Sequence, residues 1–83
     1  MNNPPTITKF YGASWCPDCH RSRKFLDENK VVYGPIDIDK VQGAADEVAK
    51  INNGYKSIPT IVFSDGTVLV EPSNQELALK LSL

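Results

Sequence analysis

The nine residues GASWCPDCH, numbered 12–20, hold the only two cysteines of this 83-residue chain. Cys16 and Cys19 stand where an extended apolar run ending at Tyr11 gives way to an amphipathic helical pattern beginning at Arg21. The first sulfur would lie at a helix N-terminus, where unpaired backbone N–H groups and the helix dipole stabilise an anion. Two thiols at this spacing can close a disulfide and reopen it, so a strand–Cys-x-x-Cys–helix arrangement predicts thiol–disulfide exchange.

Two other uses of the cysteine pair compete with redox chemistry. A zinc site needs four ligands, and Cys16, Cys19 and His20 would need carboxylates or a second chain to complete it. An iron–sulfur cluster shared across a dimer is a related alternative. A purely structural disulfide is the remaining one, although so short a loop constrains the unfolded chain little. We therefore favour redox chemistry, assign no metal ligand, and keep a metal-binding or cluster-binding module as the alternative function.

Composition narrows the range of partners and compartments. A net charge of −1 provides no global field for nucleic acid. The chain begins Met-Asn-Asn-Pro-Pro, without the basic-then-apolar pattern of a signal peptide, and contains no apolar run of membrane-spanning length. A Cys-x-x-Cys without other cysteines indicates a reducing compartment. We expect one domain over residues 1–83, located in the cytoplasm, with no nucleic-acid or membrane partner.

Residue patterns predict the first half of the fold. A β-rich run over residues 6–11 predicts the first strand. Pro17 suits the first turn of the following helix, which we expect to continue to Asn29. Residues 31–38 predict a second strand, and the Gly34-Pro35 pair within it argues for an edge position or a bulge.

The second half begins with another helix. Apolar residues recur at helical spacing over residues 41–51, and Asn52-Asn53-Gly54 supplies a stop. Residues 60–63 predict a strand, residues 64–66 a tight turn, and residues 67–70 the partner strand of a hairpin.

The tail carries two conflicting patterns. Its leucines alternate from Leu77 to Leu83, which is typical of a strand, whereas Ser73 and Glu76 form a capping box, which is typical of a helix start. We favour the helix. The resulting order β-α-β-α-β-β-α predicts an α/β fold, in which a right-handed crossover joins a parallel pair and the hairpin completes a four-stranded mixed sheet flanked by helices.

Three short motifs lie next to these elements: Tyr11-x-x-x-Trp15-Cys16-Pro17-x-Cys19, Ser57-Ile58-Pro59-Thr60 and Asp65-Gly66. Together they resemble the glutaredoxin family, which has the thioredoxin fold. Further segments look like the mycoredoxin branch, which consists of small glutaredoxin-like proteins of actinobacteria: Ile36-Asp37-Ile38-Asp39, Ala44-Ala45, Asn52-Asn53-Gly54 and Pro72-Ser73.

The resemblance implies roles for the motif and its surroundings. Cys16 would be the attacking thiolate and Cys19 the buried resolving thiol. Pro59 matches the cis-proline of the family, although an ordinary proline at a strand start is the other interpretation. The backbone of Ile58 would pair with the cysteinyl unit of the substrate.

Two departures from the family pattern concern the small thiol. Many glutathione-using members have a lysine three residues before the first cysteine, where this chain has Ala13. Many also have Gly-Gly and an acidic pair before the last helix, where this chain has Val70-Glu71-Pro72-Ser73-Asn74. Lys56, Ser73 and Asn74 remain candidate contacts for a carboxylate, with a solvated lysine and plain helix capping as the alternatives.

Three side chains border the cysteines. Trp15 is either an exposed docking ring for partner peptides or a wedge that fixes the loop, and the sequence favours neither. Asp18, where many glutaredoxins have an aromatic residue, is expected to disfavour a second negative charge on Cys16, unless it points to water as a first-turn acid. Tyr11 is expected to be scaffold.

Taken together, the residues and the resemblance predict a thiol–disulfide oxidoreductase. It would reduce protein disulfides, or mixed disulfides with small thiols, through Cys16 and Cys19. It would need no bound cofactor and would use mycothiol, glutathione or a similar thiol as co-substrate. We expect a monomer whose partners are disulfide-containing proteins and either that thiol or a flavin-dependent disulfide reductase.

Overall fold

The helices and strands follow the order that the sequence predicts. The computed structural model describes residues 3–83, so expectations about the chain start at Met1 and Asn2 lie outside the described residues. Within that range the elements are β1 (Ile7–Gly12), α1 (Pro17–Glu28), β2 (Pro35–Asp37), α2 (Ala44–Ile51), β3 (Thr60–Phe63), β4 (Val68–Val70) and α3 (Asn74–Leu81). The predicted order β-α-β-α-β-β-α is confirmed.

The strands form one mixed sheet in the order β2-β1-β3-β4. β1 is parallel to β2 and antiparallel to β3, while β3 and β4 pair as the expected hairpin. β2 lies at an edge, as the Gly34-Pro35 pair predicts. Tyr11 near the end of β1 pairs with Thr60 at the start of β3. The loop that follows β1 and the loop that precedes β3 therefore meet at the same end of the sheet.

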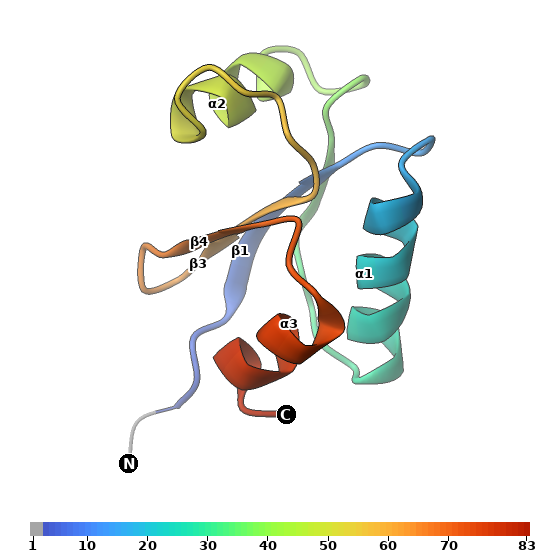
Figure 1. The fold of residues 1–83 in the computed structure, drawn as a ribbon, viewed down its shortest axis with the longest axis vertical. Coiled ribbons are helices and arrows are strands. Elements are labelled where there is room, and N and C mark those ends of the chain that lie inside the picture. Colours follow the sequence, from blue (N-terminus) through green and yellow to red (C-terminus); the bar gives the residue numbers. More distant parts are fainter. Residues whose placement is uncertain (1–2) are drawn as a thin grey trace.

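Helices cover both faces of the sheet, with α1 and α3 on one face and α2 on the other (Figure 1). Successive strand residues point to opposite faces. Phe10 accordingly packs with Leu26 of α1 and Leu77 of α3, whereas the next residue, Tyr11, packs with Val48 of α2. The layer formed by α1 and α3 also contains both cysteines.

The predicted extension of the second strand to Val31 is wrong. α1 ends in a Schellman motif, in which the Val31 N–H donates to the Leu26 carbonyl at 2.9 Å and Lys30 has a φ of 56°. Residues just after the helix therefore complete its C-terminus. Gly34 has a φ of 50°, and a Cβ there would lie 2.7 Å from a β1 carbonyl oxygen. Only beyond this close approach does the chain join the sheet, at Pro35.

The second helix is shorter than predicted. α2 begins at Ala44, after Gly43 with a φ of 84°, whereas the helical spacing starts at Val41. Val41 instead lies in a turn, where its N–H donates to the Asp37 carbonyl at 2.9 Å, and it is 48% exposed. Ala44 and Val48 alone are buried in this helix.

The C-terminal tail is helical, as the capping box predicts. The Ser73 hydroxyl accepts the Glu76 N–H at 3.1 Å, and the Glu76 carboxylate accepts the Ser73 N–H at 3.0 Å. Leu77 and Leu81 are buried, whereas Leu79 is exposed, which is a helical pattern rather than a strand pattern. Among residues 3–83, no helix combines the length and apolarity that a membrane span requires.

Candidate active site

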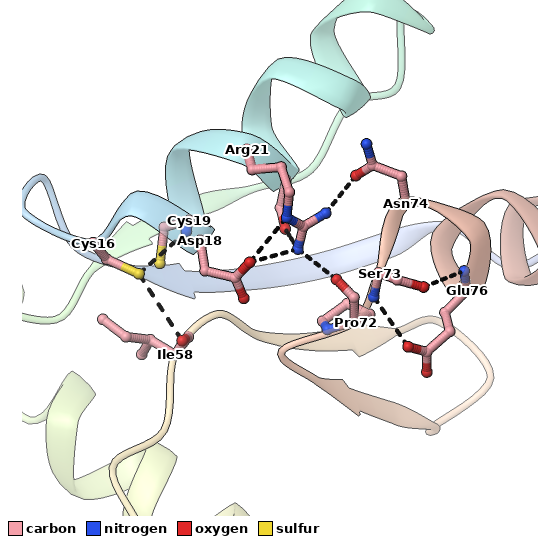
Figure 2. A network of polar contacts seen from close by, with 10 residues as sticks. Cys16, Asp18, Cys19, Arg21, Ile58, Pro72, Ser73, Asn74 and Glu76 are labelled. Carbon is pink, nitrogen blue, oxygen red and sulfur yellow. Dashed lines mark hydrogen bonds and ion pairs between the residues drawn. The ribbon is translucent and has the colours of Figure 1, made fainter.

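The first cysteine is the N-cap of α1. Its Sγ accepts the Cys19 N–H at 3.1 Å, so one of the unpaired donors at the start of the helix points at this sulfur. The Cys16 thiol also donates to the Ile58 carbonyl at 3.9 Å, which joins α1 to the loop before β3 (Figure 2). The side chain is buried but retains 5% exposure. This sulfur is thus held between two elements that meet at one end of the sheet.

The second cysteine lies deeper. Cys19 has no exposed surface, and both cysteines are free thiols. Burial is the main reason why the pKa of the Cys19 thiol is raised from 9.0 to about 12. A backbone hydrogen bond from Ala13 and the charge of Arg23 act in the opposite direction and offset burial only in part. Cys19 is therefore a protonated thiol at neutral pH.

The loop before β3 presents its backbone to the first cysteine. The Ile58–Pro59 peptide bond is cis, as the resemblance implies, and both residues are buried. Ile58 and both cysteines belong to the same core cluster. The sequence-predicted group Cys16, Cys19, Ile58 and Pro59 is therefore brought together.

A polar network connects the first turn of α1 to the start of α3. Arg21 forms an ion pair with Asp18 at 2.8 Å and donates to the Pro72 carbonyl at 2.6 Å and to the Asn74 side chain. It also donates to the buried Ser22 hydroxyl at 3.1 Å. The Asp18 carboxylate is turned toward the Arg21 guanidinium (Figure 2). The ion pair offsets part of the charge that Asp18 was expected to direct at Cys16.

Two predicted contacts at the start of α3 are already engaged within the protein. The Ser73 hydroxyl and backbone N–H belong to the capping box with Glu76, and the Asn74 side-chain oxygen accepts from Arg21. Capping, the alternative considered for Ser73, is therefore its observed contact. A role of Ser73 and Asn74 in binding a substrate stays a prediction.

The remaining predicted residues lie around the rim of the site. Trp15 is 65% exposed, and its indole N–H donates to the Asp39 carboxylate at 2.6 Å, so the ring is tethered at one edge and not wedged into the core. Lys56 is exposed in the loop between α2 and β3. Tyr11 is scaffold, as predicted: it is buried, donates to Glu47 at 2.6 Å, and has a pKa raised to about 12, chiefly by burial.

A second polar chain lies on the opposite side of α1. His20 Nε2 lies 2.6 Å from the Ser14 carbonyl, and its Nδ1 lies 3.0 Å from an Arg23 guanidinium nitrogen. A carbonyl can only accept and a guanidinium can only donate, so we assign the tautomer with the proton on Nε2. His20 therefore links the active-site loop to Arg23.

Comparison with known proteins assigns this geometry to a family. The glutaredoxin family model matches residues 7–69. The chain belongs to the glutaredoxin family. A Mycobacterium tuberculosis protein named "Putative glutaredoxin" is 38% identical over 71 residues, covering 86% of this chain and 84% of that protein. Mycoredoxin 1 of Corynebacterium glutamicum is 35% identical, covering 86% and 87%.

Structural comparison agrees with this assignment. A mutant of the thioredoxin-like protein BC3987 superimposes with a TM-score of 0.77 and 30% identity, covering 89% of this chain and 92% of that one. The expected thioredoxin-like fold is therefore confirmed. Glutaredoxins are thiol–disulfide oxidoreductases that act on disulfides with small thiols as co-substrates and need no bound cofactor, and the chain is an enzyme of this class.

The donor groups of this glutaredoxin bear on a metal site formed within a single chain. Within residues 3–83, no three His, Cys, Asp or Glu side chains are grouped so that they could hold a metal ion. Both ring nitrogens of His20, the histidine next to the motif, are engaged by protein groups.

The sequence leaves the run from His20 to Lys24 with two interpretations, an influence on the Cys16 thiolate or, for most of the run, a solvated helix face. Neither interpretation identifies the contacts of Arg21 and Arg23. The i, i+3 spacing of Asp18 and Arg21 is a local signal for their ion pair, although it does not reveal the partners in residues 72–74. No sequence pattern predicts that Arg23 approaches the end of β1, because that contact depends on how α1 packs on the sheet.

Proposed function

We propose that this glutaredoxin reduces protein disulfides, and mixed disulfides with small thiols, through the dithiol Cys16-Pro17-Asp18-Cys19. One observation carries the proposal: Cys16 Sγ lies at the N-terminus of α1, where it accepts the Cys19 N–H, and beside the Ile58 carbonyl. A helix N-terminus stabilises the thiolate that attacks. The Ile58 carbonyl, released when Cys16 gives up its proton, can then accept a backbone N–H of the substrate.

The proposed reaction proceeds in two exchanges. The Cys16 thiolate attacks one sulfur of a disulfide R–S–S–R′, forms a Cys16–S–S–R bond and expels R′–S⁻. The Cys19 sulfur, after losing its proton, attacks Cys16 Sγ and expels R–S⁻, which takes up a proton. The product is a Cys16–Cys19 disulfide, and two electrons from a small thiol or a flavin-dependent reductase return it to the dithiol. In the monothiol route, a small thiol performs the second exchange instead of Cys19.

The surroundings of α3 support a co-substrate thiol without carboxylate groups. A hollow of about 380 Å³ lies beside the network in Figure 2, and its charged lining consists of Asp18, Arg21, Glu71 and Glu76. Three carboxylates face one guanidinium, which already donates to four protein oxygens. Glutathione carries carboxylates at both ends, whereas mycothiol carries none. Repulsion in this hollow therefore disfavours glutathione relative to mycothiol.

The test is reduction of the oxidised protein by mycothiol, by glutathione and by the diethyl ester of glutathione, with thioredoxin reductase and NADPH as a further arm. We expect mycothiol to react at least about tenfold faster than glutathione, which corresponds to about 1.4 kcal/mol. The ester should recover part of that difference because it lacks the repelled charges. Glu76→Gln, which keeps an acceptor for the Ser73 N–H, should improve glutathione selectively, whereas the exposed and remote Glu28→Gln should not.

Two results would contradict the proposal at different levels. Rapid reduction by glutathione, with no gain from the ester or from Glu76→Gln, would refute the preference for a thiol without carboxylates. An absence of exchange with any disulfide, or full activity of Cys16→Ser, would refute the dithiol function itself.

A further inference from the structure

The buried cysteine presents a chemical problem that the first cysteine does not. If the dithiol route proposed above operates, Cys19 must become a thiolate in order to attack Cys16 Sγ. Cys19 has no exposed surface, and it lies in an apolar cluster with Phe10, Leu26 and Ile58. A buried thiolate without a nearby positive charge is strongly disfavoured. A group that compensates this charge is therefore expected close to the sulfur.

One guanidinium is placed to do so. A Cβ built on Gly12 would lie 3.2 Å from Cys19 Sγ and 3.3 Å from Arg23 Nη1. The sulfur and the guanidinium therefore both lie over the same Cα at the end of β1. Because this position is a glycine, it places no side chain of its own between the two groups, and the third neighbour of that point is the edge of the Phe10 ring at 3.1 Å. A unit positive charge within a few ångströms favours the charged form of a thiol.

The guanidinium is held at this position by a series of hydrogen bonds that runs through His20. Arg23 Nη2 donates to His20 Nδ1 at 3.0 Å, and His20 Nε2 donates to the Ser14 carbonyl at 2.6 Å. Ser14 belongs to the loop that carries Cys16. These hydrogen bonds thus connect the loop that carries Cys16 to Arg23, which lies near Cys19 Sγ.

Arg23 borders a cavity near the end of β1. The cavity has a volume of about 370 Å³ and is lined in part by Ala13, Arg23, Tyr33 and Asp37. Asp37 accepts the Asp39 N–H at 2.9 Å, which satisfies one of its oxygens locally. Ala13 is the position at which many glutathione-using glutaredoxins have lysine, so in this chain the cation beside the cavity comes from α1 instead of the loop.

We propose that Arg23 promotes the resolving step, because its guanidinium, held over Gly12 by His20 and the Ser14 carbonyl, stabilises the Cys19 thiolate that attacks Cys16 Sγ. In this step the Cys19 S–H bond is broken, a Cys19–Cys16 S–S bond forms, and the Cys16–S–R bond breaks. The expelled R–S⁻ takes up one proton, so the step is balanced without a further reactant. Arg23 acts on the second exchange and not on the first, whose nucleophile is Cys16. His20 is the positioning residue for Arg23.

The experiment separates the two exchanges in time. Reduced protein is mixed with bis(2-hydroxyethyl) disulfide, quenched in acid at intervals, and analysed by mass spectrometry for the Cys16 mixed disulfide and for the Cys16–Cys19 disulfide. Arg23→Met should lengthen the lifetime of the mixed disulfide about tenfold and leave its rate of formation unchanged. Arg23→Lys, which keeps the charge, should restore the lifetime to within about threefold of the unaltered protein. The exposed neighbour Lys24→Met is the matched control and should change neither step.

The outcomes distinguish the inference from the function on which it rests. An unchanged lifetime in Arg23→Met, or an Arg23→Lys protein as slow as Arg23→Met, would overturn the role of the charge. An unchanged lifetime in His20→Ala would overturn the positioning role of His20. If no Cys16–Cys19 disulfide forms in the unaltered protein, the proposed dithiol route itself fails.

Discussion

Arg21 and Arg23 stand two residues apart on α1 and have opposite surroundings. Two residues span about 200° around a helix, so the side chains leave from nearly opposite sides. Arg21 points toward α3 and donates to oxygens of Asp18, Ser22, Pro72 and Asn74. Arg23 points toward the end of β1, where it meets His20 and lies near Cys19. Arg21 therefore links α1 to the start of α3, whereas Arg23 places a positive charge near the Cys19 sulfur.

The sulfurs of Cys16 and Cys19 also have different surroundings. Replacing either cysteine with serine should have the largest effect of the substitutions considered. We predict that Cys16→Ser lowers disulfide exchange at least about a thousandfold, because its nucleophile is gone. Cys19→Ser should accumulate a stable mixed disulfide at Cys16, because nothing nearby resolves it. Mass spectrometry after reaction with bis(2-hydroxyethyl) disulfide checks both variants. If Cys16→Ser forms the mixed disulfide and Cys19→Ser does not, the roles are reversed.

The burial of Cys19 should appear as alkaline sensitivity of the reduced protein. Its pKa is raised from 9.0 to about 12, mainly by burial, so ionisation of Cys19 leaves the free energy of unfolding unchanged well below pH 9. Above that value the unfolded chain releases the proton while the folded chain keeps it, and stability falls by up to about 1.4 kcal/mol per pH unit. Urea unfolding under reductant, between about pH 8 and 10.5, should show a steeper decline for the unaltered protein than for Cys19→Ala. Tyr11 and Tyr33 are present in both proteins, so equal slopes would contradict the expected contribution of Cys19.

Replacing each arginine with methionine should affect different properties of the protein. We predict that Arg21→Met lowers the free energy of unfolding by about 1–2 kcal/mol, because charge-assisted bonds between α1 and α3 are lost at a side chain that is only about one-third exposed. Arg23→Met should cost less stability and should instead slow the resolving step. Urea unfolding and the mixed-disulfide lifetime, measured on both variants, give four values. A comparable stability loss in both variants would remove the distinction between them.

The smallest effect is expected from Asp18. Its charge is offset by Arg21, and Asp18→Asn keeps an oxygen that accepts from Arg21 Nε. We predict that Asp18→Asn accelerates formation of the mixed disulfide by no more than about threefold, because the thiolate gains little from removal of a charge that is already paired. In an Arg21→Met background the same substitution should have a larger effect, since the carboxylate is then unpaired. Equal effects in the two backgrounds would show that Arg21 does not screen Asp18.

Local patterns were sufficient for most of the fold. The capping box of Ser73 and Glu76 decided correctly between a helix and a strand for the tail, because the backbone donors at a helix start need partners wherever the helix lies. The two errors, at Val31 and Val41, occurred at helix ends. There the positive φ values of Lys30 and Gly43 redirect the chain, and apolar spacing does not report them.

The sequence by itself determined the pair of cysteines, their position at a helix N-terminus and the order of elements that brings Ile58 to Cys16. These features depend on residues close together in the chain or on a family motif. Only the tertiary structure decided that Asp18 is paired with Arg21, that Arg21 binds residues 72–74, and that Arg23 lies over Gly12 beside Cys19. The physical reason is that a charge acts on whatever lies within a few ångströms of it. That distance is fixed by how α1 packs against α3 and the sheet, which no spacing along the chain encodes.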